Sequence, residues 1–516
     1  MYLTSLSRKG KTMSQESDLM QPRGIAVPTE TGYQVMEGKG ALVNRNSVIF
    51  AIGQGISLIG DNIYLSTLII WISAVTLAAA HTPAQKAAVA ATVTAIQAGI
   101  FGANYLAGFL IIPFVGVFVD RWNRRTTMII ADLVQAVLAL LPLVAFLLAK
   151  NVFIPAIYVT YFLLVAAQGF FAGSQSGVLQ VIVARKSFPQ AVSILNVLIG
   201  IGAVAGFALA PSFFIAVGPI IAITFNALSF VISAIALFLL RIPREAVHPY
   251  VFRQRDDLAA AVSIGKSIAG VFKDLWRGLR FVFTTRVLFG IVIMLIVVQI
   301  GAAAVNSLTS GFFFANLHAS PTKDLALISL LPAALGTGGI IGAILVGVLA
   351  RFVPLKALAI TGILGIGLGL INIAFLSNVT SGVFFYFIAG IFNNLFVVSY
   401  SALVIKVTPN PIIGRVEGVL TPLATFSSFI SAFAVGAIVA AYNPALNPRT
   451  PFPNSAVLFT DIFVISGIVA VVASIIGFLF LRQAKEEVTG VEKLVTAPAH
   501  PSMGDEPPII AGEAGS

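Results

Sequence analysis

The sequence predicts an all-α membrane protein with twelve transmembrane helices arranged as two six-helix bundles. Of the 516 residues, 58% are hydrophobic. Only 10% are charged, whereas about a quarter of a soluble chain is charged. Apolar segments of about 20 residues or more, the length that crosses a bilayer, recur along the whole chain.

Twelve such runs are present, and they are too long and too uniformly apolar for the strands of a barrel, so each predicts a helix. Their limits are 47–80, 90–119, 127–149, 152–184, 191–217, 220–241, 284–315, 324–350, 355–377, 381–408, 415–441 and 457–481.

The runs divide the chain into five parts. Residues 45–242 and 284–482 are the expected N-terminal and C-terminal bundles, and residues 1–44 and 483–516 are polar and expected to be disordered cytoplasmic tails. Residues 243–283 form the linker between the bundles. In the linker, apolar residues recur at helical spacing among lysines and arginines, which predicts an amphipathic helix on the anionic membrane surface or in solvent.

The basic residues predict the orientation. If both termini are cytoplasmic, all of the 31 lysines and arginines except Lys86, Lys150, Lys323 and Arg449 lie on the cytoplasmic side. This asymmetry follows the positive-inside rule and indicates a multi-pass protein of the inner or plasma membrane. It also explains the net charge of +11 without any binding of nucleic acid.

Several kinds of site are not supported by the sequence. The chain contains no cysteine, and its four histidines lack metal-ligand spacing, so we expect no metal and no cofactor. No phosphate-binding GxxxxGK[ST] sequence occurs, which leaves an ion gradient or the substrate gradient as the energy source. Scattered acidic and histidine residues do not favour a membrane-embedded enzyme.

Asp61 is the acidic residue expected deepest in the membrane. It lies roughly 21 Å into the first run at 1.5 Å per residue, inside a hydrocarbon core of about 30 Å. Burial disfavours the ionised carboxylate, so Asp61 is a candidate for proton coupling. The alternative is a structural aspartate that is hydrogen-bonded to Asn62 or to a neighbouring helix.

Polar side chains inside the runs are candidates for a substrate cavity, because lipid cannot satisfy them. The candidates are Asn62, Tyr64, Gln97, Asn104, Gln175, Asn306 and Asn393. Alternatively, these side chains join helices to one another. No lysine or arginine lies deep in a run, which favours neutral or cationic cargo over a strongly anionic substrate.

The stretch GVFVDRWNRR, from Gly116 to Arg125, concentrates charge directly after the second run. Asp120 can accept hydrogen bonds from a neighbouring helix N-terminus. The proposed gate group comprises Gly116, Asp120, Arg121, Arg124 and Arg125, with Arg185, Gly414 and Arg415 as candidate partners. The alternative is that the basic residues only fix the topology.

The second half carries a weak repeat of this stretch. GVLARFVPLK, from Gly347 to Lys356, follows the eighth run and lacks the aspartate. Two parallel six-helix repeats suggest alternating access, in which two bundles move about a site near the membrane midplane.

The pattern G-x-x-x-D-R-x-x-R-R between the second and third runs resembles the major facilitator superfamily. Two further stretches resemble its bacterial macrolide-efflux and siderophore-exporter branch: SLIGDNIYLSTLIIW, from Ser57 to Trp71, and PNPIIGRVEG, from Pro409 to Gly418. The resemblance spans roughly residues 45–482 and assigns GVFVDRWNRR to a cytoplasmic gate. The missing aspartate in the second half weakens any symmetric gating role there.

The resemblance implies a secondary transporter that exports a hydrophobic or amphiphilic small molecule, by alternating access and proton antiport. The expected partners are membrane lipid, the substrate and a proton, with no nucleic acid, and the protein is expected to be a monomer. A nutrient importer or a lysophospholipid flippase on the same fold is the first alternative, and a membrane-embedded enzyme is the second.

Overall fold

The structure is a computed structural model of the chain, and it describes residues 26–29, 32–35, 43–81, 83–119, 122–183, 187–242, 275–317, 325–408, 413–443, 447, 449 and 455–482. Its long helices are α1 (Arg45–Ala78), α2 (Pro83–Val119), α3 (Arg124–Leu148), α4 (Phe153–Ile182), α5 (Phe188–Leu239), α8 (Arg286–Asn316), α9 (Leu325–Leu349), α10 (Leu355–Ala374), α11 (Val379–Val407), α12 (Ile413–Tyr442) and α13 (Ser455–Arg482). A short 3₁₀ turn, η2 (Lys150–Val152), precedes α4.

Eleven helices are long and apolar enough to span a membrane, and one of them contains two spans. Helix α5 has 52 residues, and its backbone leaves the helical region at Gly218, which has φ 78° and ψ 171°. A right-handed helix cannot continue through this conformation. The break separates arms 188–217 and 219–239, so the described residues contain the twelve membrane-spanning segments that the sequence predicts.

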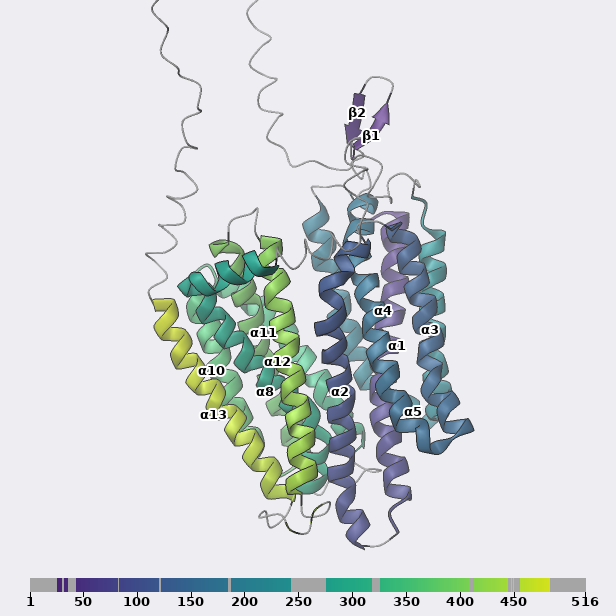
Figure 1. The fold of residues 1–516 in the computed structure, drawn as a ribbon, viewed down its shortest axis with the longest axis vertical. Coiled ribbons are helices and arrows are strands. Elements are labelled where there is room, and N and C mark those ends of the chain that lie inside the picture. The colour runs from purple at the N-terminus through teal and green to yellow at the C-terminus, as the bar shows by residue number, and fades with distance from the viewer. Residues whose placement is uncertain are drawn as a thin grey trace, which may run out of the picture.

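The spans form two bundles, α1 to α5 and α8 to α13 (Figure 1). Within the first, α1 packs on α5, and α3 packs on α4 and α5. Within the second, α11 packs on α9 and α10, and α13 packs on α10 and α8. This division agrees with the predicted six-plus-six arrangement.

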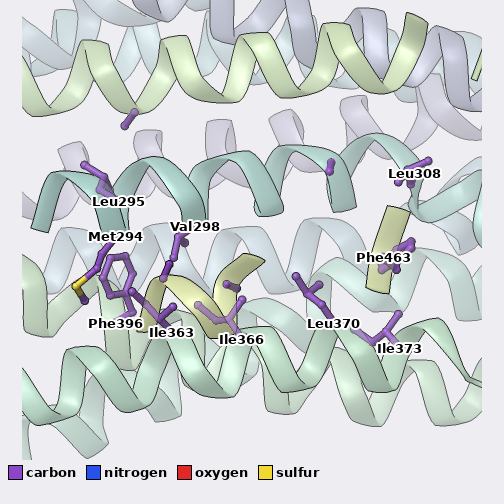
Figure 2. Packing of buried hydrophobic residues seen from close by; sticks show 14 of the residues in the cluster. Met294, Leu295, Val298, Leu308, Ile363, Ile366, Leu370, Ile373, Phe396 and Phe463 are labelled. Carbon is purple, nitrogen blue, oxygen red and sulfur yellow. The ribbon is translucent and has the colours of Figure 1, made fainter. Parts of the chain in front are cut away.

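Each bundle has its own apolar core. In the first, Tyr64, Leu68, Ile157 and Ile223 belong to one buried cluster. In the second, α8, α10 and α11 bring Val298, Ile363, Leu370 and Phe396 together, and Phe463 of α13 joins them (Figure 2). Lipid is as apolar as these side chains, so close packing, more than the hydrophobic effect, holds the helices together.

The described lysines and arginines gather at one end of the bundles. We call the end that carries Arg45, Arg124 and Arg125 the basic face, and the other end the opposite face. Among the lysines and arginines whose side chains are described, only Lys150 and Arg449 lie at the opposite face. The distribution agrees with the one-sided placement of charge that the sequence predicts.

Two short elements lie outside the spans. Strands β1 (Ala26–Thr29) and β2 (Gly32–Val35) pair antiparallel within the segment expected to be a disordered tail, in the register Ala26↔Val35. Residues 275–284 of the linker are helical. The rest of the predicted amphipathic helix, residues 258–274, lies outside the described residues.

The helix of residues 275–284 packs on the start of α12. A Cβ on Gly278 would lie within 3.1 Å of Val419 and would collide with the Arg415 carbonyl oxygen. Trp276 and Phe283 remain exposed. This part of the linker is therefore docked against the second bundle and is not a free solvated helix.

Candidate functional site

The two bundles meet along a seam formed by α2 against α12 and α8, and by α5 against α9. Helices α2 and α12 run side by side along it (Figure 1). The rings of Phe109 and Phe426 pack with centroids 4.7 Å apart. A Cβ on Gly436 would lie 3.5 Å from the Ala98 Cβ, and a Cβ on Gly336 would lie 3.2 Å from a Val204 methyl group. Small residues thus bring the bundles into contact at several depths.

A cavity of about 340 Å³ opens within this seam. Its lining comes from α1, α2, α5, α8, α9 and α11, so both bundles contribute. The described lining consists of Leu65, Ser66, Ile69, Ile70, Ser73, Gln97, Phe101, Phe207, Asn306, Thr309, Ser310, Phe314, Ile328, Pro332, Leu335, Gly336, Tyr386, Asn393 and Asn394. None of these side chains is charged at neutral pH, and neutral amides and hydroxyls stand among apolar groups, as in many small-molecule sites.

Hydrogen bonds cross the seam beside the cavity. Gln97 of α2 donates from Nε2 to the Asn306 carbonyl oxygen of α8 over 2.7 Å. The Asn306 side-chain amide donates to the Tyr105 hydroxyl over 3.2 Å. These two bonds tie the two bundles together. Within the second bundle, the hydroxyls of Thr309 and Tyr386 are 2.8 Å apart, and this pair holds part of the polar lining in place.

Of the seven predicted cavity residues, the structure brings Gln97, Asn306 and Asn393 together in the lining. The other four are placed elsewhere: Asn62 donates to the Leu58 carbonyl of its own helix, Tyr64 to the Ala139 carbonyl, and Gln175 to Gln54, while Asn104 is half-buried outside the lining. Among these four, the bonds of Tyr64 and Gln175 connect neighbouring helices, and the bond of Asn62 stays within α1.

Several hydroxyls of the lining were not predicted from the sequence. Ser66 and Ser73 lie seven residues apart on α1, and Thr309 and Ser310 follow Asn306 by three and four residues on α8. Residues that are three, four or seven positions apart lie on one face of a helix. This spacing was the signal in the sequence from which the lining hydroxyls could have been predicted. Serine and threonine also bond to their own helix, as Thr309 does to the Val305 carbonyl, so the signal is weak.

Asp61 lies in the first bundle, next to the cavity. It is half-buried in α1, sixteen residues after Arg45, which is roughly 24 Å along the helix. Leu65, one turn further on, lines the cavity. Asp61 thus lies within a continuous helix near the level of the cavity, and its neighbour in space is Asn226 of α5.

Residues 50–432 match the Major Facilitator Superfamily over most of the chain. The chain belongs to the Major Facilitator Superfamily. The two bundles, the broken α5 and the cavity at their seam are thus the features of a membrane transporter of this superfamily. Among the described residues, no group of histidines, cysteines or acids could hold a metal ion.

Solved structures with the same fold include members with different cargo. The chain resembles a mutant of the nucleoside transporter NupG, with 14% identity, TM-score 0.61, and coverage of 84% of this chain and 100% of that one. A bacterial homologue of the human lysosomal transporter Spinster shares 12% identity, with TM-score 0.59 and coverage of 86% and 99%. A bacterial homologue of the iron transporter ferroportin shares 13%, with TM-score 0.59 and coverage of 84% and 98%.

These likenesses show the superfamily fold alone, because all three identities are below 25%. No curated protein sequence matches this chain significantly. Membership of the macrolide-efflux and siderophore-exporter branch therefore remains a prediction.

The predicted gate group is only partly visible. Asp120, Arg121 and Arg185 lie outside the described residues, and Gly116 and Gly414 lie within α2 and α12 without described contacts. Arg415 is half-buried at the start of α12, where its carbonyl faces Gly278. The gate role of this group remains a prediction.

Arg124 and Arg125 make contacts inside the first bundle. Arg125 donates from Nε to the Leu237 carbonyl over 3.0 Å and from a terminal nitrogen to the Phe238 carbonyl. It therefore bonds to carbonyls of the last turn of α5, and the Leu237 carbonyl also accepts a bond from the Leu240 backbone N–H over 3.3 Å. The Arg124 guanidinium packs against Gly177 of α4, and its Nε has no hydrogen-bond partner among the described residues.

A second and larger hollow lies away from the seam. It has a volume of about 770 Å³ and lies between α3 and α4, where Ile130, Val134 and Leu163 line it. Stacked rings of Trp122 and Phe170 close one end. Its lining is almost wholly apolar and largely exposed on the outside of the bundle, where lipid tails pack, so we assign the substrate to the seam cavity.

Proposed function

We propose that this protein is a secondary active transporter that exports a hydrophobic or amphiphilic small molecule, drug-like or siderophore-like, by alternating access and proton antiport. The observation that carries the proposal is the 340 Å³ cavity lined by both bundles at their seam. A site shared by two bundles can be exposed to either side of the membrane when one bundle moves against the other.

The lining supports the class of cargo. Phe101, Phe207 and Phe314 offer apolar surface, and the amides of Gln97, Asn393 and Asn394 offer neutral hydrogen-bonding groups. The absence of a charged group from the described lining leaves a strongly anionic substrate without a counter-charge. Amphiphilic molecules that are neutral or cationic fit such a lining best.

Asp61 supports proton coupling. It is an acid within a membrane span, one turn from the cavity-lining Leu65, and intramembrane acids commonly mark proton pathways. Such a carboxyl would couple the movement of protons to the movement of cargo, because it would bind a proton when cargo leaves and release it when cargo enters. We place the basic face in the cytoplasm of a cell whose inner or plasma membrane holds the protein, following the positive-inside rule.

A polar solute such as a nucleoside is the second candidate cargo, and uptake is then the direction. The cavity carries four side-chain amides, those of Gln97, Asn306, Asn393 and Asn394, and amides can bond to the edges of nucleobases. This candidate uses the same site and fold. It differs from the exporter of an amphiphilic molecule in its cargo and in its direction of transport.

The test is transport by purified protein in liposomes, with ethidium, a macrolide, a catecholate siderophore, a lysophospholipid and uridine as probes. We expect a pH gradient to drive uphill movement of an amphiphilic probe by the wild type. Asp61→Asn should abolish uphill movement but retain counterflow exchange, because only the coupling group is lost. Asp461→Asn, at an exposed position of α13, is the matched control and should behave as wild type.

Two results would contradict the proposal. Counterflow of uridine alone would favour the nucleoside candidate, and unchanged pH-driven transport by Asp61→Asn would remove Asp61 as the coupling group. Because the chain has no cysteine, a Lys150→Cys variant also tests the orientation. An impermeant maleimide should label this exposed position of the opposite face in intact cells, and failure to label it would reverse the orientation.

A further inference from the structure

The second arm of α5 carries a row of polar side chains along one buried face. Asn226, Ser229 and Ser233 occupy positions i, i+3 and i+7, and all three are at most 1% exposed. This spacing puts them on one side of the helix. Burying a row of polar side chains inside an apolar bundle costs free energy unless these side chains form hydrogen bonds or have a function.

The row faces α1, and glycines of α1 make the approach possible. A Cβ on Gly60 would lie 2.5 Å from the Ser229 Oγ and 2.7 Å from the Asn226 Oδ1. A Cβ on Gly53 would lie 2.7 Å from the Ala236 Cβ. Gly53 and Gly60 are seven residues apart, so the same face of α1 is kept free of side chains against the polar row.

This row connects two acidic residues of different helices. At one end, the Asn226 side chain lies near the Asp61 carboxyl of α1, although its Nδ2 forms no hydrogen bond among the described residues. At the other, the Ser233 side chain interacts with the Asp132 carboxyl of α3, which is 2% exposed. The two carboxyls also interact with each other electrostatically.

Further polar groups extend the row at its Asp132 end. Gln54 of α1 donates from Nε2 to the Ser233 hydroxyl over 3.0 Å. Gln175 of α4 donates to the Gln54 side-chain oxygen over 3.5 Å. All four helices around the row thus contribute to one polar path inside the first bundle.

The path descends toward the basic face. Asp132 lies eight residues after Arg124 at the start of α3, or roughly 12 Å along the helix, and Asp61 lies roughly 24 Å along α1. A proton that moves from Asp61 to Asp132 would therefore leave the level of the cavity and approach the basic face.

Several buried polar atoms on this path lack a hydrogen-bond partner among the described residues. They are the Nδ2 of Asn226, the Oδ2 of Asp132 and the Nε2 of Gln135, which lies one turn from Asp132. Buried polar atoms are normally satisfied, and internal water is the usual partner where protein groups are missing. Orphaned atoms at both ends of the row indicate that water molecules complete it.

We propose that Asp132 is a second proton-binding group, which exchanges a proton with Asp61 through a hydrated polar row along Asn226, Ser229 and Ser233. The O–H bond of a protonated Asp61 breaks, the proton passes through water, and an O–H bond forms on the Asp132 carboxylate. Asp132 then releases the proton toward the basic face. This inference rests on the proposed coupling role of Asp61 and adds the route by which its proton leaves.

The groups that face the pair fit this exchange. The titratable side chains near Asp61 are Tyr64 of α1 and Tyr161 of α4. Ser233 and Gln54 meet the pair from α5 and α1 as uncharged groups. Within the described residues no cation pairs with either carboxyl, so a proton is the available source of neutralisation.

The test follows the carboxyl C=O stretching band by infrared spectroscopy, as a function of pH, on the full chain in liposomes without any cargo. We expect two coupled deprotonation steps in the wild type. Asp61→Asn and Asp132→Asn should each remove one step and shift the midpoint of the other. The double variant should lose both, and Asp461→Asn should keep both.

A second variant guards against loss of folding in Asp132→Asn. Ser233→Ala retains both carboxyls and should shift one of the two steps, because the Ser233 hydroxyl that it removes interacts with Asp132 and not with Asp61. An unchanged spectrum for Asp132→Asn, a remaining step that does not shift, or an unchanged Ser233→Ala titration would overturn the proposal. Since no cargo is present, a wrong assignment of cargo or direction leaves this result unaffected.

Discussion

At the scale of single residues, glycines determine where polar side chains of neighbouring helices can approach one another. Gly60 lets Asn226 and Ser229 approach α1, and Gly206 lets α5 approach the Cβ of Asn62. A buried polar group is tolerated in a membrane only when another polar group lies within reach. The glycines of α1 therefore serve the polar row as well as the packing.

Replacing Gly60 by valine should destabilise the protein by about 1–3 kcal/mol, because overpacking forces the helices apart. The new Cβ would lie 2.5 Å from the Ser229 Oγ. Thermal unfolding in detergent measures the change.

Gly55 of the same helix provides the control, since a Cβ there would meet no atom within 4 Å. Gly55→Ala should stabilise by roughly 0.5–1 kcal/mol, because alanine favours a helix more than glycine does. Equal stability of Gly60→Val and wild type would mean that the two helices are not in close contact here.

Residue chemistry also shows how far the site could be predicted. The depth of Asp61 followed from counting residues, because a helix rises by a fixed amount per residue. The different roles of Asn62 and Asn306 could not be predicted by counting, because both are asparagines inside apolar helices. Asn62 bonds to its own helix and Asn306 lines the cavity, and this difference depends on which neighbouring helix each one faces.

At the scale of elements, the break in α5 is the clearest departure from regular helix. Gly218 adopts φ 78° and ψ 171°, a region that is essentially restricted to glycine. Pro219 follows, and proline suits the first turn of the next helix. The two residues turn one long helix into two spans.

Gly218→Ala should cost about 1–3 kcal/mol, because a Cβ strains this backbone conformation. Apart from its chain neighbours, no described atom would lie within 4 Å of a Cβ at this position, so a loss of stability would report backbone strain and not a clash. The thermal midpoint of the purified variant is the measurement.

Gly347→Ala is the comparison, because Gly347 is also open but helical. It should be as stable as the wild type or more so. If both substitutions were equally tolerated, the backbone at Gly218 would not have the glycine-specific conformation described here.

Element ends explain another feature of the first bundle. Arg125, expected to contribute to a gate, bonds to the carbonyls that end α5. The favourable interaction of a cation with a helix C-terminus accounts for this contact. A residue can have this role and also act in a gate, so the gate remains a prediction.

At the scale of the whole molecule, the contacts at the seam contribute to stability and also have to change during transport. Its contacts include the Phe109–Phe426 pair and the bond from Gln97 to Asn306. Alternating access requires some of these contacts to break in each cycle.

A disulfide across the seam should therefore stop transport. The Ala98 Cβ and a Cβ on Gly436 would be 3.5 Å apart, within the range of about 3.5–4.5 Å that a disulfide needs. We expect the Ala98→Cys, Gly436→Cys double variant to lose counterflow of an amphiphilic probe after oxidation and to regain it after reduction.

The chain's lack of cysteine removes competing thiols. A protease site placed in residues 243–274 would show the cross-link, since the halves would separate on a gel only after reduction. Each single variant is a control. Full counterflow by the cross-linked protein would show that this part of the seam need not open.

The sequence by itself determined the twelve spans, their two-bundle division, the gathering of charge at one end and the depth of Asp61. These features follow from hydropathy, charge and helical rise, which are properties of a residue and its near neighbours. Only the tertiary structure decided that Gln97, Asn306 and Asn393 share a cavity and that Asp61 and Asp132 lie beside Asn226 and Ser233 of the same helix, α5. The reason is rotational: each helix is apolar on nearly every side, so only packing against its neighbours determines which face turns inward.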